Sequence, residues 1–147
     1  MATEIQQHCE TIEECYEFAL SYAARGVSGE NAGDAGKQIR EYLTRAAVAM
    51  RGLEQSYAEA VRSGELAPAE KFEAFFPALQ RDAQSAVAAV EIVLAQPVIG
   101  SQLIDNLNAS MHLRALLADL FLVTEILEVR QAREKAAVAA NGAGDLR

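Results

Sequence analysis

The sequence contains no tryptophan, only three prolines and two cysteines, and no convincing alternating run of β-branched residues. The scarcity of proline and of β-type alternation argues against a sheet protein and favours long helices. Hydrophobic residues make up 51% of the 147 positions, so the chain is long and apolar enough to bury one core. The composition predicts a single all-helical domain.

Positive charge is also scarce, because 13 Lys and Arg residues face 21 Asp and Glu residues and the net charge is −8. An acidic chain is repelled by phosphate groups, so we expect neither nucleic-acid binding nor binding to anionic membrane surfaces. The longest apolar run, ending at Val123, is interrupted by Asp119 and falls short of the ~20 residues of a membrane span. The polar first ten residues lack the pattern of a signal peptide. These features predict a cytoplasmic protein.

Two cysteines without a disulfide-rich pattern fit a reducing compartment. On one helix, Cys9 and Cys15 would have Cα atoms roughly 10 Å apart, which exceeds the ~7 Å limit for a disulfide. We therefore expect two free thiols at or near the edge of the core.

Four segments carry apolar residues at the helical period, and three breaks separate them. Thr3 is the expected N-cap of the first segment, and Gly64 the expected end of the second. Pro77 falls inside the third and should kink it. The predicted helices cover about residues 3–25, 37–63, 68–95 and 101–140.

Four amphipathic helices joined by short to medium loops predict an antiparallel four-helix bundle. We expect this bundle domain to cover residues 1–140. Residues 136–147 are rich in alanine and include two glycines, and residues 141–147 are predicted to form a flexible C-terminal tail.

The predicted fourth helix, over residues 101–140, is longer and more apolar than the other three. Between Leu113 and Val129 it is apolar over about two-thirds of its circumference, against the ~100° or more expected of a surface helix. Three shorter neighbours would not cover such a helix completely. Its excess length should project from the bundle or pack on a second copy, so we expect a homodimer through this helix.

Three ionisable residues, Asp105, His112 and Asp119, fall on the apolar side of the same helical wheel. Their seven-residue spacing separates successive Cα atoms by about 10.5 Å along the axis, so one metal ion cannot bind all three. Asn108 stands three residues after Asp105 and four before His112, and we expect hydrogen bonds among them. The stripe is interpreted as a structural polar layer, a subunit interface or a ligand pocket, and we predict no metal site.

Two tyrosines, Tyr16 and Tyr42, lie on or beside the inner stripes of the first and second helices. If they converge on His112, the three would line a polar pocket. The candidate ligand-binding residues are Asp105, Asn108, His112, Asp119, Tyr16 and Tyr42.

Catalytic signatures are missing. The Glu-x-x-His motif of di-iron bundles is absent at both His8 and His112, and no Cys-x-x-Cys or His-Glu-x-x-His occurs. Gly36 and Lys37 lack the spacing of a phosphate-binding loop. The sequence therefore assigns no catalytic residue and identifies no cofactor.

Two hypotheses remain from different classes. The favoured one is a non-catalytic helical-bundle protein that acts through protein–protein interaction, as an adaptor, a chaperone-like protein or a regulatory subunit. The alternative is a bundle that binds a small ligand or a cofactor, or is an enzyme, with a polar site around His112, Asp105 and Asp119. The first is favoured because catalytic geometry is missing.

Overall fold

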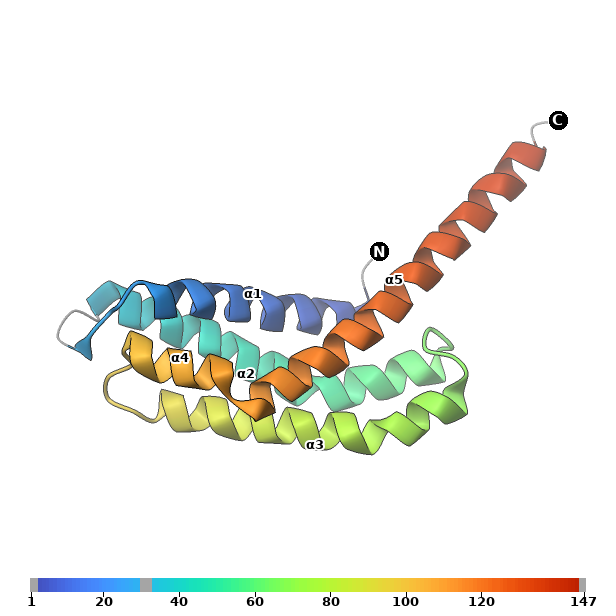
Figure 1. The fold of residues 1–147 in the computed structure, drawn as a ribbon. Coiled ribbons are helices and arrows are strands. Elements are labelled where there is room, and N and C mark those ends of the chain that lie inside the picture. Colours follow the sequence, from blue (N-terminus) through green and yellow to red (C-terminus); the bar gives the residue numbers. More distant parts are fainter. Residues whose placement is uncertain (1–2, 30–32, 146–147) are drawn as a thin grey trace.

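The computed structural model of the chain describes residues 3–29 and 33–145, and that part of the chain is built from helices alone (Figure 1). The all-helical class predicted from composition is therefore confirmed, although the described residues form five helices and not four. In chain order the helices are α1 (Glu4–Ala24), α2 (Gly33–Arg62), α3 (Ala69–Leu94), α4 (Ser101–Ala109) and α5 (Met111–Asp145).

The single helix predicted over residues 101–140 is wrong, because Ser110 interrupts it. Ser110 is extended, with φ −65° and ψ 139°, and its N–H donates to the carbonyl of Leu107 at 3.1 Å. Its hydroxyl accepts from the N–H of Leu113 at 3.3 Å, as the N-cap of a new helix does. A serine side chain can compete with helical backbone bonds in this way, and here it caps the start of α5. Beyond the break, α5 continues to Asp145, past the predicted end at residue 140.

The first helix begins as its sequence predicts. Thr3 and Gln6 form a capping box, in which Gln6 N donates to Thr3 Oγ1 at 3.3 Å and Thr3 N donates to Gln6 Oε1 at 2.9 Å. The helix ends just before Gly26, whose φ of +67° lies in the left-handed region that glycine adopts without strain.

The second and third helices meet at a turn that glycine also permits. α2 ends at Arg62, and Gly64 follows with a φ of +85°, which confirms the predicted stop. α3 passes through Pro77 without ending, and Figure 1 shows it changing direction in its first half. Near this bend the hydroxyl of Tyr57 in α2 donates to the carbonyl of Phe72 at 2.6 Å, which ties the bent segment to α2.

The core lies between the helices in one continuous cluster of buried side chains. α2 packs between α1 and α3, while α4 lies against α1 and α5 lies mainly against α3 (Figure 1). Residues three and four apart along each helix face this core, as their spacing predicts. Fully buried members include Ile5, Ile12, Leu43, Leu53, Leu79, Ile104 and Leu120.

A polar clamp fixes the end of the molecule where α4 begins. The hydroxyl of Ser101 donates to Tyr22 O at 2.6 Å and accepts from Val27 N at 2.7 Å, and the N–H of Ser101 donates to Val27 O at 2.8 Å. The phenol of Tyr22 donates to Ile99 O at 2.5 Å. These bonds satisfy buried polar groups and hold the start of α4 on the end of α1.

Candidate interaction surface

The inner face of α5 closes the core. Leu116 and Leu120 are 0% exposed, and Val123 and Leu127 are almost as fully covered. They lie three and four residues apart, so one face of the helix carries them all. Burial of one such side chain contributes about 1.5–3 kcal/mol, so this face holds α5 on the rest of the protein.

The outer face of the same helix is also apolar, and it faces solvent. Met111, Phe121, Leu122 and Val129 are 82%, 51%, 55% and 49% exposed. Over the described residues, nine large hydrophobic side chains are exposed, and five of them lie on α5. Since isolated exposed side chains are ordinary but a contiguous row is not, this face is the candidate interaction surface.

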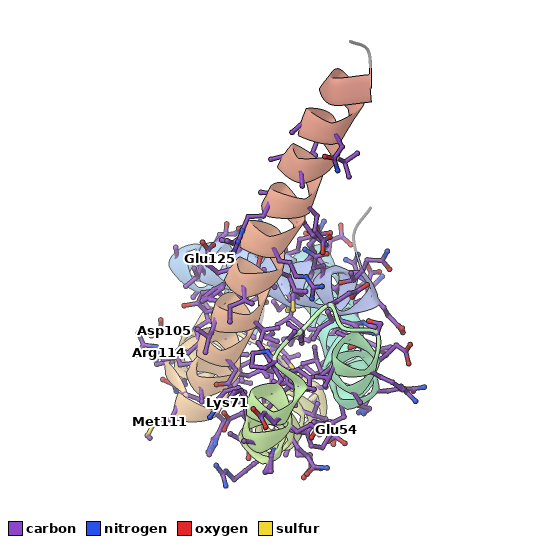
Figure 2. The ribbon with its side chains drawn as sticks, turned by 90° about the vertical axis from the view of Figure 1, so that its right-hand side faces the viewer. Glu54, Lys71, Asp105, Met111, Arg114 and Glu125 are labelled. Carbon is purple, nitrogen blue, oxygen red and sulfur yellow. The ribbon has the colours of Figure 1, made fainter. Side chains whose placement is uncertain are left out.

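One line of residues along this outer face has a regular spacing, and we name this line the outer seam. Most of its members are exposed and Ala115 is half-buried. Figure 2 shows Met111, Arg114 and Glu125 on the same side of α5, directed away from the other helices, with Asp105 of α4 on that side too. The outer seam consists of Met111, Ala115, Ala118, Leu122, Glu125 and Val129.

Beyond Gln131, α5 leaves the body of the protein, by which we mean α1–α4 together with the first part of α5. The amides of Gln6 and Gln131 exchange two hydrogen bonds, at 3.1 and 3.0 Å, and Arg130 donates to the carbonyl of Gly64. From Ala132 to Gly142 every residue is exposed, and Figure 1 shows this end extending past the other helices. At 1.5 Å per residue the projecting end, residues 132–145, is about 20 Å long.

Two open grooves flank α5 where it departs from the body. One, of about 670 Å³, has Ile126, Val129 and Ala137 on the helix and Glu65 on the opposite side. The other, of about 680 Å³, includes Leu127 and Val138 of α5. Apolar side chains of the projecting end thus stay accessible from two sides.

The structure disperses the polar stripe predicted on the fourth helix. Asp105 of α4 and His112 of α5 are both exposed, and only Asp119 is half-buried. The prediction that all three lie on the apolar side is wrong for the first two, because a helical wheel drawn through the break at Ser110 does not describe two separate helices. Asp105 lines an open groove of about 550 Å³ beside Gly26 and Gly100, and neither His112 nor Asp119 lines that groove.

Asn108 and Tyr16 do meet, at a small cavity near the break. Asn108 is 6% exposed, and its Nδ2 and Oδ1 atoms have no hydrogen-bond partner within the described chain, so the predicted bonds to Asp105 and His112 are wrong. The cavity, which Cys15 also lines, measures about 10 Å³. A space of that size matches one water molecule and is too small for an organic ligand.

Tyr42 lies elsewhere, on the α1–α2 contact. Its ring stacks on Phe18 with centroids 4.1 Å apart, and the guanidinium of Arg45 lies 4.6 Å from its centroid. Arg25 lies over the Phe18 ring at 5.6 Å. This contact is aromatic and cationic and joins two helices, so Tyr42 does not share a site with Tyr16 and His112.

Asp119 has an electrostatic neighbour of its own sign, Asp82 of α3. Burial raises the pKa of Asp119 to about 7, a hydrogen bond with Asp82 and its charge add to the rise, and Arg81 opposes it. Its Oδ2 atom is buried without a donor among the described residues. Two adjacent carboxyls of this kind share one proton, since both cannot ionise without repulsion.

Both thiols are free and buried, as the sequence predicts. Burial is the main cause that raises the pKa of Cys9 and of Cys15 to about 12. A thiol that does not ionise near neutral pH is a poor nucleophile and a poor metal ligand. No group of three or more His, Cys, Asp or Glu side chains is placed to hold a metal ion within residues 3–29 and 33–145.

None of the helices in the described part of the chain combines the length and the hydropathy that crossing a membrane requires. Comparisons with protein-family models, with curated proteins and with solved structures found no match to this chain. The surface of α5 is therefore the feature of the molecule that bears on function.

The residues that matter most for this surface were not among the candidates drawn from the sequence. Met111, Phe121, Leu122 and Val129 look like core residues in a sequence, since nothing local distinguishes them from Leu116 or Leu120. One available signal was the width of the apolar arc, which is too broad for one buried face. It predicts a contact through this helix but does not single out these residues. The other was the 3.5-residue spacing of the outer seam.

Proposed function

We propose that this protein is non-catalytic and acts by binding protein, first of all a second copy of itself, through the outer face of α5. In this view it is an adaptor, a chaperone-like protein or a regulatory subunit of a larger assembly. The exposed apolar row on α5 is the observation that supports the proposal, because such rows mark contact sites more often than free surface.

The body suits such a role as a rigid support. We propose that it is a four-helix bundle in which α4 and the first part of α5 together occupy the place of a fourth antiparallel helix. The inner face of α5 then fixes the helix, while the outer face and the projecting end stay available for contact. The two buried free thiols fit a reducing compartment, and we propose a cytoplasmic location.

The small-ligand alternative finds no comparable support. Of the six candidate ligand-binding residues, Asn108 and Tyr16 share a cavity, and it is about 10 Å³ in volume. Ligand pockets are typically about 300–1,000 Å³ with convergent polar groups. The larger grooves beside α5 are open, and none of the six residues lines the two beside the projecting end.

The experiment is a comparison of mass in solution, by light scattering after size exclusion, for three forms of the full chain. Wild type should have about twice the 15.8 kDa mass of one chain. Leu122→Glu should reduce the mass to one chain, because it places a charge on the outer seam. Ile92→Glu is the matched control, since Ile92 is an exposed apolar residue on α3 and is 66% exposed.

The control should stay dimeric with the same helical circular dichroism as wild type. A wild-type chain that stays monomeric up to about 100 µM, equivalent to a binding free energy weaker than about −5.5 kcal/mol, would overturn the homodimer. If Leu122→Glu and Ile92→Glu dissociate the dimer equally, the outer face of α5 is not the dimer contact.

A further inference from the structure

The spacing of the outer seam is that of a contact line between two helices. Its members are alternately four and three residues apart, the 3.5-residue repeat of coiled coils. The pattern continues at Ala132 and Ala136 on the projecting end. Two of the seam positions before Val129, Ala115 and Ala118, are small, and they let a second helix approach toward the short end of the usual 8–10 Å range.

One flank of the seam carries charges that find no partner within the body. Arg114 and Glu128 are both exposed, and neither takes part in the ion pairs formed among the described residues. Glu128 lies near Glu13 of α1, whose carboxyl pKa is raised first by burial and next by the charge of Glu128. A cation brought to this flank would therefore relieve an existing repulsion.

We propose that a second copy of this chain docks on the outer seam with its α5 antiparallel. This inference rests on the proposed function and adds the orientation and register of the contact. A two-fold axis passes between the two helices, midway between residues 118 and 122 of each. On the seam, the facing residues of the two copies are Ala118 with Leu122, Ala115 with Glu125, and Met111 with Val129.

The same register pairs the flank. Arg114 of each copy lies beside Glu128 of the other copy. It also lies close to Glu125 of that other copy, which faces the small Ala115 of the same copy as Arg114. The two Phe121 rings meet near the axis, where an aromatic pair packs well. This one register thus joins the two seams and supplies the missing cation at Glu128. Each contact between two different residues occurs twice, as an isologous interface requires.

A parallel pair also brings opposite charges together on its flanks, Arg114 toward Asp119 and Glu128 toward Arg133. It would, however, place Glu125 of one copy against Glu125 of the other in the middle of the seam. Two carboxylates that lose water side by side without a donor are costly. Asp119 is half-buried against α3 and is therefore a poor partner for Arg114. The antiparallel pair avoids both problems.

The test uses the full chain with cysteines added on the seam, as Met111→Cys, Val129→Cys and the double variant. Both positions are exposed, so the core is untouched. The native Cys9 and Cys15 can stay, because both are buried and wild type serves as the control for them. Within one helix the two positions are about 27 Å apart, so no disulfide can form inside a single chain.

In the antiparallel dimer each position faces the other, not itself. We expect mild oxidation to give a covalent dimer in the double variant, and neither single variant to cross-link beyond wild type. Cross-linking of each single variant would establish a parallel pair and overturn this inference, although the dimer of the proposed function would stand. A dimer by light scattering that cross-links in none of the three also overturns it, and a monomer overturns the proposed function as well.

Discussion

The two faces of α5 are both largely apolar, but their surroundings are opposite. Leu120 is 0% exposed and Leu122 is 55% exposed, although they are the same residue type two positions apart. The inner face is apolar because the body covers it. The outer face is apolar without such cover, and the proposed contact with a second copy rests on this difference.

The largest expected effect separates the two faces directly. Leu120→Ala should lower the free energy of unfolding by about 2–5 kcal/mol, because it opens a cavity in the core. Leu122→Ala is the matched control. It should change the free energy of unfolding of the dilute single chain by less than about 0.5 kcal/mol. Urea unfolding of both variants at low concentration measures the difference. Equal losses would mean that Leu122 is as well packed as Leu120.

A second prediction concerns the edge between the two faces, where Asp119 lies beside Asp82. The folded pKa of Asp119 is raised to about 7, whereas an unfolded Asp titrates near 3.9. The folded state therefore keeps a proton that the unfolded state releases. The stability that depends on this proton is complete below about pH 4 and is lost as the pH rises through about 7.

Asp119→Asn keeps the shape and removes this titration. Urea unfolding at about pH 5 and about pH 8 should show wild type losing more stability than Asp119→Asn over that interval. Because the substitution leaves the carboxyls outside this pair unchanged, Glu13 among them, the comparison isolates the Asp119–Asp82 pair. Parallel pH profiles for the two proteins would contradict the shared proton.

The smallest effect concerns the polar residues first assigned to a site. Asn108 is buried with two unpartnered polar atoms, so Asn108→Leu should leave the free energy of unfolding unchanged or raise it by about 1 kcal/mol. His112 is exposed, and His112→Leu should change it by less than about 0.5 kcal/mol. A loss above about 2 kcal/mol in Asn108→Leu, measured by urea unfolding, would mean that the amide makes bonds that the structure does not show.

Local signals in the sequence predicted much of the fold. Thr3, Gly64 and Pro77 act through their own backbone preferences, so the cap, the stop and the bend could be read without knowing the neighbours. The apolar periodicity predicted the helices and their buried stripes in the same way.

The break at Ser110 and the outer seam could not be read with the same certainty. Ser110 is only a weak helix former, and whether it bends a helix or caps a new one depends on what α4 packs against. A helical wheel drawn without this break places Asp105 and His112 on the apolar side, although both are exposed. Whether Leu122 is covered depends on tertiary structure, because periodicity marks apolar faces but does not say which of two is buried.

The mass of the unmodified chain in solution tests most directly whether a second copy covers the outer face of α5. Sedimentation equilibrium should give about twice 15.8 kDa for wild type and 15.8 kDa for Leu122→Glu, with Ile92→Glu unchanged from wild type. A wild-type mass of one chain throughout the concentration range would contradict the claim that a second copy covers the outer face of α5.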